Sequence, residues 1–332
     1  MKIKDIWLEQ ESDPVFSAGL MLKGFGGTFL PQVFIGLISP GRCRCIAASI
    51  SMAISIDLNH YLGLQDLEIE LKADTKNTDR NYLIFKLTNP VHNDIFSVLC
   101  EDLISSIANV SNERTLVKEL FNRFENWNTL FKRAPGDWLT PESQRGLYGE
   151  LHFLREFLNA NSEHYKTVNS WVGCEMQVRD FQTGGWAVEV KTTKGNNHQK
   201  VHINGERQLD TTNLDQLFLY HLSLEVLQQS GETLNAIILS ICELLSADLV
   251  AFNRFKTKLM FSGYREEDSH HYDDSGYLIR DQSFYKVEGS FPRIQESDLR
   301  KGLGDIHYSI ILSNCTDYIT DSTTVFNTTT FS

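Results

Sequence analysis

The stretch Asp180–Lys191 reads DFQTGGWAVEVK, and it decides the expected fold. Two short apolar runs flank a Gly-Gly pair, a pattern typical of a β-hairpin with a small loop. Successive side chains of the second run alternate between two faces. One face takes Trp186, Val188 and Val190, and the other takes Ala187, Glu189 and Lys191. A carboxylate and an ammonium group therefore stand side by side on a strand that is otherwise built for burial.

Asp180 ends the first run of this hairpin and can reach the same spot as Glu189 across the turn. Two carboxylates, with a lysine two residues beyond the second, form a site for a hard divalent cation and a water molecule. The stretch therefore predicts a site that can hydrolyse phosphodiester bonds.

The composition is that of an ordinary globular protein and fits about two domains. The chain has 332 residues, of which 41% are hydrophobic and 22% are charged. The most apolar run, Val33–Ile56, is broken by Pro40, Arg42 and Arg44, so we expect no membrane span. The N-terminus lacks the pattern of a signal peptide, and the six cysteines are scattered. We therefore expect reduced thiols and a cytoplasmic protein.

The net charge of −12 argues against binding of nucleic acid by bulk electrostatics. Contact with nucleic acid would need a local basic patch or a partner subunit. The most basic short region contains Lys194, Lys200 and Arg207 together with His198 and His202. Because this region directly follows Lys191, it is either a surface for a phosphate backbone or a solvated loop.

Residues 1–135 are expected to form a β-rich accessory domain with a helical connector. Strands are predicted over Leu30–Ser39, Arg44–Leu58, Leu67–Ala73 and Tyr82–Thr88. Apolar residues at three- and four-residue spacing predict helices near 93–110 and 113–133. Ala134-Pro135-Gly136-Asp137 is the clearest interruption in the chain and marks the boundary. The domain is either purely structural or a module for specificity or docking.

A helix should begin at Thr140-Pro141-Glu142 and continue to about residue 159, because this triplet supplies a capping hydroxyl, a proline and an acidic residue. Glu150 lies within or beside the apolar stripe of this helix. A carboxylate there is costly unless it has a partner. Glu150 therefore either reaches water at the edge of the stripe or joins Asp180 and Glu189 in one site.

Residues 136–230 are expected to form an α/β (α+β) core. Strands are predicted at Thr167–Trp171, Met176–Phe181, Trp186–Thr193 and Gln216–Leu227, and a short helix is predicted to start at Asn204. The resulting order, αβββαβ, defines a small mixed sheet with its site at a strand end.

Residues 231–332 are expected to add a C-terminal extension of helices and strands. Helices are predicted over 232–246 and 247–261, with Ser246 capping the second and Gly263 ending it. Strands are predicted near Ser283–Val287 and Tyr308–Leu312, and poor order is expected for the last dozen residues. His270-His271 is expected to lie in a solvated loop, because no further metal ligands stand at a suitable spacing.

The candidate residues form an ordered set along the chain: Glu150 on a helix, Asp180 at a strand end, and Glu189-Val190-Lys191 on the paired strand. This set resembles the PD-(D/E)XK nuclease superfamily, which includes many type II restriction endonucleases. The resemblance narrows to an uncharacterised bacterial family of PD-(D/E)XK motif proteins and spans nearly the whole chain. The stretches that carry it are Thr140-Pro141-Glu142, Arg145–Leu151, Trp171 with Gly173, Asp180-Phe181, Glu189–Thr192, Glu206–Leu209 and Phe291–Ile294. One departure is Arg179, which stands where the motif has proline. Members of this family often lie in restriction or phage-defence operons beside DNA methyltransferases and MutL-like ATPases.

The resemblance implies a restriction-endonuclease-like fold and a metal-dependent endonuclease that cuts double-stranded DNA. Asp180, Glu189 and the Val190 carbonyl would bind Mg²⁺, which Mn²⁺ can replace. Lys191 would orient or deprotonate the attacking water and stabilise charge on the phosphate oxygens. Glu150 would bind a second metal ion or a metal-bound water, and Gln208 would position the phosphate or a water. The residues implied to contact the DNA backbone are Lys194, Lys200 and Arg207.

Two other functions stay open. The chain could be a DNA-binding or scaffold subunit of a defence complex with a silent nuclease site, and its acidic charge favours this alternative. It could also be an RNA or repair nuclease with the same site. The intact set of four charged residues favours an active enzyme, since buried charges without a use are costly. A homodimer, or a complex with the methyltransferase or ATPase of the operon, is compatible with either function.

Overall fold

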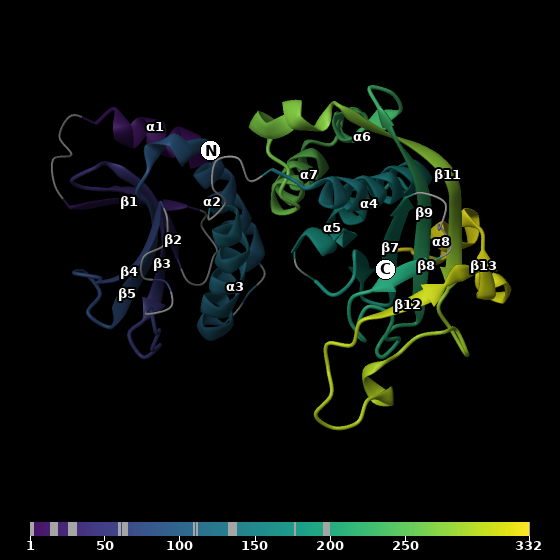
Figure 1. Ribbon diagram of the computed structural model, residues 1–332. Coiled ribbons are helices and arrows are strands. Elements are labelled where there is room, and N and C mark those ends of the chain that lie inside the picture. The colour runs from purple at the N-terminus through teal and green to yellow at the C-terminus, as the bar shows by residue number, and fades with distance from the viewer. Residues whose placement is uncertain are drawn as a thin grey trace. The chain divides into compact units, whose positions relative to one another are not determined.

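The chain divides into two compact units, Met1–Pro135 and Gly136–Ser332. The computed structural model (Figure 1) describes residues 3–13, 19–25, 32–58, 61, 66–108, 110, 112–131, 138–175, 177–194 and 200–331. The predicted boundary Ala134–Asp137 lies outside the described residues, as do Leu30, Met176 and His198. No helix within the described ranges is long and apolar enough to cross a membrane. All six cysteines are described, and each is free.

The first unit is an antiparallel five-stranded sheet combined with helices. Its strands are β1 (Leu20–Phe25), β2 (Val33–Ile38), β3 (Cys43–Ser51), β4 (Leu67–Ala73) and β5 (Arg80–Leu87), in the order β1-β2-β3-β5-β4. Its helices are α1 (Ile3–Glu11), α2 (Asn93–Ile107) and α3 (Glu113–Phe131). The four strands and two helices predicted here are confirmed, β4 with the predicted ends and the others with shifted ends, whereas α1 and β1 were not predicted.

The second unit is built on a mixed sheet, which confirms the predicted fold class. The sheet runs β10-β11-β9-β7-β6, and β13 pairs with β11. These strands are β6 (Phe181–Thr183), β7 (Trp186–Lys194), β9 (Gln216–Gln228), β10 (Glu232–Thr233), β11 (Ser275–Lys286) and β13 (Ile319–Thr320). Strands β7 and β9 are parallel, whereas β6–β7, β9–β11, β10–β11 and β11–β13 are antiparallel.

Each face of this sheet has its own apolar layer. Helices α4 (Pro141–Ala160), α5 (His164–Ser170), α6 (Leu234–Leu244) and α7 (Leu249–Phe261) lie on one side (Figure 1). They pack in one cluster with Trp186, Val188 and Val190 of β7. The small sheet of β8 (Lys200–Ile203) and β12 (Tyr308–Ile311) packs with Ala187 in a second cluster. The predicted alternation of β7 is therefore confirmed.

Two strands predicted before the hairpin are wrong. The segment expected as strand Thr167–Trp171 belongs mostly to α5, because Val168 is fully buried in the helical layer and this packing outweighs its β-branched shape. The described part of Met176–Phe181 forms bends, and pairing begins only at Phe181. Here the backbone N–H groups of Val172 and Gly173 donate to the Asp180 carbonyl at 2.8 and 2.9 Å.

Further differences concern the crossover and the C-terminal part. The segment from Asn204 forms a turn and no helix, and β8 was not predicted. Asp248, rather than Ser246, caps α7 through bonds to the Val250 and Ala251 N–H groups, while Gly263 follows the helix with a positive φ of 89°. Strand β11 is longer than predicted, and the histidine pair lies in a 3₁₀ helix, Glu266–Tyr272.

The last dozen residues contain a helix, so the expectation of poor order is wrong. Helix α8 (Ser322–Thr328) is capped by Asp321, whose side chain accepts a hydrogen bond from the Thr324 N–H. Phe326 and Phe331 pack against the helical layer, and the Trp186 indole donates to the Thr330 carbonyl at 2.9 Å. These contacts supply the apolar burial that the Ser- and Thr-rich composition did not suggest.

Candidate active site

The site begins where β6 stops pairing with β7. The ladder between these strands ends at Phe181 and Val188, so the next outward N–H of β7, that of Val190, needs another acceptor. The Asp180 carboxylate accepts from it at 2.7 Å. Because the N–H and C=O of one strand residue point to the same edge, the Val190 carbonyl faces the same side as Asp180.

Glu189 and Lys191 lie next to this edge on the face of β7 opposite Val190. Lys191 Nζ is 2.7 Å from Glu189 Oε1 and donates to Gln208 Oε1 at 3.2 Å. The Glu189 side chain is 1% exposed, and its Oε2 is buried without a hydrogen-bond partner. An unpaired buried carboxylate oxygen is costly, and this one lies beside a second carboxylate.

Helix α4 brings Glu150 to the same edge from the other face. Thr140 caps the helix by accepting from the Ser143 N–H, and Pro141 occupies the first turn, as predicted. A Cβ on Gly149 would lie 2.2 Å from Thr192 Cγ2, so only glycine permits this approach of α4 to β7. Glu150 Oε2 accepts from the Trp171 indole at 2.7 Å. Glu150 therefore neither points freely into solvent nor lies unpaired in the core.

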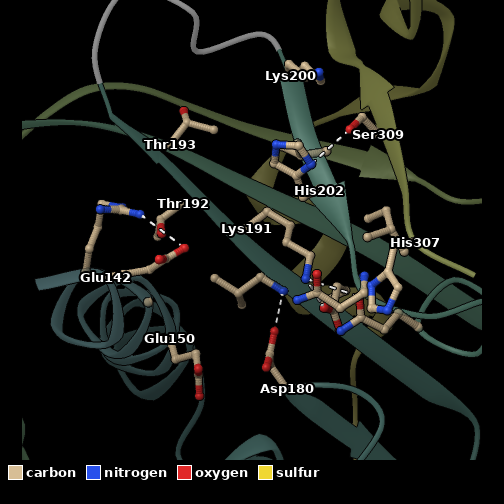
Figure 2. Close-up of a pocket in the computed structure, with 18 of the residues that line it drawn as sticks. Glu142, Glu150, Asp180, Lys191, Thr192, Thr193, Lys200, His202, His307 and Ser309 are labelled. Carbon is tan, nitrogen blue, oxygen red and sulfur yellow. Dashed lines mark hydrogen bonds and ion pairs between the residues drawn. The ribbon is translucent and has the colours of Figure 1, made fainter. Parts of the chain in front are cut away.

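These groups share one pocket of about 740 Å³ (Figure 2). The pocket brings together Glu150, Asp180, Glu189, Val190, Lys191 and Gln208. Its outer wall is formed by β8 and β12, where His202 and Ser309 are hydrogen-bonded at 2.9 Å. His307 also lines the pocket. Sequence reasoning missed this wall, because the paired strands are about a hundred residues apart and no local signal predicts their contact.

Of the three basic residues predicted to contact DNA, two line the pocket and one does not. Lys194 and Lys200 are the two that line it. Arg207 is not among its lining residues, and its exposed guanidinium pairs with Glu296 at 3.4 Å. Arg145 of α4, which the sequence analysis gave no role, lines the pocket one turn before Gly149.

Burial and mutual repulsion raise the pKa of the carboxylates. Burial, and next the charge of Asp180, raises the pKa of Glu189 to about 8 and that of Glu150 well above its usual range. Burial also raises the pKa of Asp180, although Lys191 and the Val190 N–H oppose the shift. Burial acts to lower the pKa of Lys191, but the negative charges of Glu189 and Asp180 outweigh it and the net shift is upward. The raised pKa keeps Lys191 an ammonium group in the metal-free protein, where it donates hydrogen bonds.

The donor set fits a hard divalent cation. Oxygen ligands from Asp180, Glu189 and the Val190 carbonyl suit Mg²⁺, and a cation would satisfy the orphaned Glu189 Oε2. Among the described residues, no group of three His, Cys, Asp or Glu side chains is placed to hold a metal ion. Mg²⁺ in proteins is typically held by one or two carboxylates, and water and substrate phosphate complete its shell.

An Asp at the mouth of a hairpin, followed by Glu-x-Lys on the paired strand of a mixed sheet, defines a nuclease-like site of PD-(D/E)XK type. The sequence model of the family described as "Putative PD-(D/E)XK family member (DUF4420)" matches residues 29–313. The chain belongs to this family, and PD-(D/E)XK proteins are usually nucleases that use divalent metal ions. No curated protein and no solved structure matches the chain.

Proposed function

We propose that the protein is a Mg²⁺-dependent endonuclease that hydrolyses phosphodiester bonds in double-stranded DNA. The observation that carries this proposal is that Glu150 of α4 meets Asp180 and the Glu189 and Lys191 side chains of β7 in one pocket. Nothing in local structure brings Glu150 to the other three residues, and placing three carboxylates beside one lysine is costly for folding. A site with such a cost needs a functional reason.

In the proposed mechanism, Asp180, Glu189 and the Val190 carbonyl would hold the metal ion. When bound, Mg²⁺ would polarise the phosphate and lower the pKa of a water molecule. Glu150, in its ionised form, would accept a hydrogen bond from the attacking water, orient it and take up its proton. The Lys191 ammonium donates to a phosphate oxygen and stabilises the charge that develops on it. Of the two roles implied for Lys191, deprotonation of water is the one that its raised pKa disfavours.

The remaining pocket residues would bind and orient the substrate. Lys194 and Lys200 line the pocket and would contact the phosphate backbone. Gln208 accepts a hydrogen bond from Lys191, so it would orient that ammonium rather than the phosphate itself. The proposed setting is a bacterial restriction or phage-defence system, with a DNA methyltransferase or a MutL-like ATPase as partner.

A cleavage assay on plasmid, linear DNA and RNA, with Mg²⁺ or with EDTA, tests this function. Lys191→Ala should reduce cleavage by at least about 100-fold, the loss typical of a preorganised electrostatic group. Lys166→Ala is the control. Lys166 is an exposed lysine of α5 that pairs with Glu163, and it lies outside the pocket. Cleavage that survives Lys191→Ala or EDTA would overturn the assignment, and cutting of RNA alone would replace DNA as the substrate.

A silent DNA-binding subunit is the competing function, and the net charge of −12 is the observation that favours it. Wild-type protein that binds DNA but leaves all substrates uncut with Mg²⁺ and Mn²⁺ would support this alternative.

A further inference from the structure

Arg179 stands where the PD-(D/E)XK motif has proline, and its side chain is used in a way that proline could not imitate. Arg179 is buried, with 9% of its surface exposed. Its Nε donates to the Gln208 carbonyl at 3.2 Å and its Nη1 to Gln182 Oε1 at 3.1 Å. Its Nη2 donates to the Asp210 carbonyl. The guanidinium therefore spans from the start of β6 to two carbonyls of the turn that follows β8.

This turn carries the group that contacts Lys191. Gln208 Oε1 accepts from Lys191 Nζ at 3.2 Å and from the Asn204 N–H at 2.9 Å. Within the turn, the Gln208 N–H donates to the Gly205 carbonyl and the Asp210 N–H donates to the Arg207 carbonyl, both at 3.3 Å. The turn belongs neither to a regular helix nor to a strand. Its position relative to β7 therefore depends on side-chain contacts, and Arg179 supplies two of them.

We propose that Arg179 is a positioning residue, which fixes the Gln208 backbone so that the Gln208 carboxamide holds the Lys191 ammonium in place. The inference rests on the proposed function for its catalytic meaning, although the positioning itself is a property of the folded chain. A planar guanidinium suits this task because its donors form a rigid fork that can bind two carbonyls at once. Groups that orient the residues of a site typically matter by 10- to 100-fold, although they do not touch the substrate.

The first measurement needs no catalysis. Amide hydrogen exchange of the segment 200–210 is followed in metal-free protein, where the Asn204 N–H reports on the Gln208 side chain. Arg179→Ala and Gln208→Ala should each speed exchange of this amide at least about tenfold, since both remove the fixed acceptor. Arg155→Ala is the matched control, because it removes a partly buried arginine that pairs with Glu232 away from the turn. Its Asn204 exchange should equal that of the wild type.

The second measurement is a double-mutant cycle in cleavage. Arg179→Ala and Gln208→Ala should each lower kcat by 10- to 100-fold with little change in KM. If Arg179 acts through Gln208, the double variant should be no worse than the poorer single variant by more than about twofold. Arg179→Lys, which can reach only part of the acceptor set, should fall between wild type and Arg179→Ala.

Unchanged Asn204 exchange in both Arg179→Ala and Arg179→Lys would overturn the inference, whatever the cleavage result. Multiplicative losses in the double variant would do the same, because they would mean that the two residues act independently. If the wild type itself fails to cleave, the proposed function fails while the exchange measurement still decides whether Arg179 holds the turn.

Discussion

Addition of Mg²⁺ should stabilise the folded protein strongly at pH 8.5 and weakly at pH 6. The reason is that the pKa of Glu189 is raised to about 8, first by burial and then by the charge of Asp180. A metal ion binds the deprotonated carboxylate, so below pH 8 it must displace a proton. Metal affinity should therefore fall by up to about tenfold for each pH unit below 8.

The expected magnitude follows from mass action. Metal at about 100 times its Kd adds about 2.7 kcal/mol to the free energy of unfolding. For a unit the size of Gly136–Ser332, each kcal/mol shifts the Tm by about 2–4 °C, so the Tm should rise by roughly 5–11 °C at pH 8.5. At pH 6 the same Mg²⁺ concentration is only about equal to Kd, and about 0.4 kcal/mol and 1–2 °C remain.

Thermal melts across a Mg²⁺ series at both pH values measure this difference. Asp180→Asn and Glu189→Gln should lose most of the rise at pH 8.5, because each removes one charged ligand. Asp317→Asn is the control, since Asp317 is an exposed carboxylate outside the pocket and should leave the rise intact. An equal rise at the two pH values, or a wild-type response in the two ligand variants, would refute the reasoning.

Three further outcomes are expected. Gly149→Ala should lower the free energy of unfolding in urea by about 1–3 kcal/mol, because the new Cβ would lie 2.2 Å from Thr192 Cγ2. Adding Thr192→Ser to the same chain should restore most of this free energy, since serine lacks the Cγ2. If no stability is restored, this contact is not the cause. In EDTA, the unfolding free energy of Glu189→Gln should equal that of the wild type near pH 4.5 and exceed it by a few kcal/mol at pH 9. The raised pKa of Glu189 gives the wild type stability that is lost as the pH rises from 4.5 through about 8. A difference in unfolding free energy that does not change with pH would contradict this. Trp171→Phe should move the acid limb of the pH–rate profile to higher pH. In the wild type the hydrogen bond from Trp171 lowers the pKa of Glu150, so removal of this bond raises that pKa. An unmoved limb would exclude ionised Glu150 from the reaction.

Local pattern predicted β7 well because its alternation reports directly on burial. A residue at every second position packs in one apolar layer, so the placement of Glu189 and Lys191 on a single face follows from the sequence. Glu150 could be named from its place beside the apolar stripe of α4, and the ordered set of four charged residues from its resemblance to the PD-(D/E)XK motif. The polar contacts of Lys191 could not be foreseen, because Gln208 reaches it through a turn that has no periodicity.

The region before the hairpin shows where local pattern fails. The N–H groups of Val172 and Gly173 donate to the Asp180 carbonyl, and a Cβ on Gly173 would lie 2.7 Å from Asp180 Oδ1. A short apolar run with Trp171 at its end looks like a strand when only propensity is considered. The sequence did contain one signal against a strand. Gly173, two residues after Trp171, indicates a close approach of two backbone segments.

The charges of the pocket explain how a chain with a net charge of −12 could still bind a polyanion. Its basic lining residues are Arg145, Lys191, Lys194 and Lys200, and its acidic ones are Glu142, Glu150, Asp180 and Glu189. At a pH high enough to ionise all four carboxylates, the two sets balance in number, and the pocket without metal then offers no net attraction to a phosphate backbone. One Mg²⁺ at Asp180 and Glu189 would tip this balance by two positive charges at the point where the scissile phosphate must lie. On the proposed function, the metal ion would thus make both binding and cleavage possible, and the acidic surface elsewhere would limit attachment to DNA that does not reach the pocket.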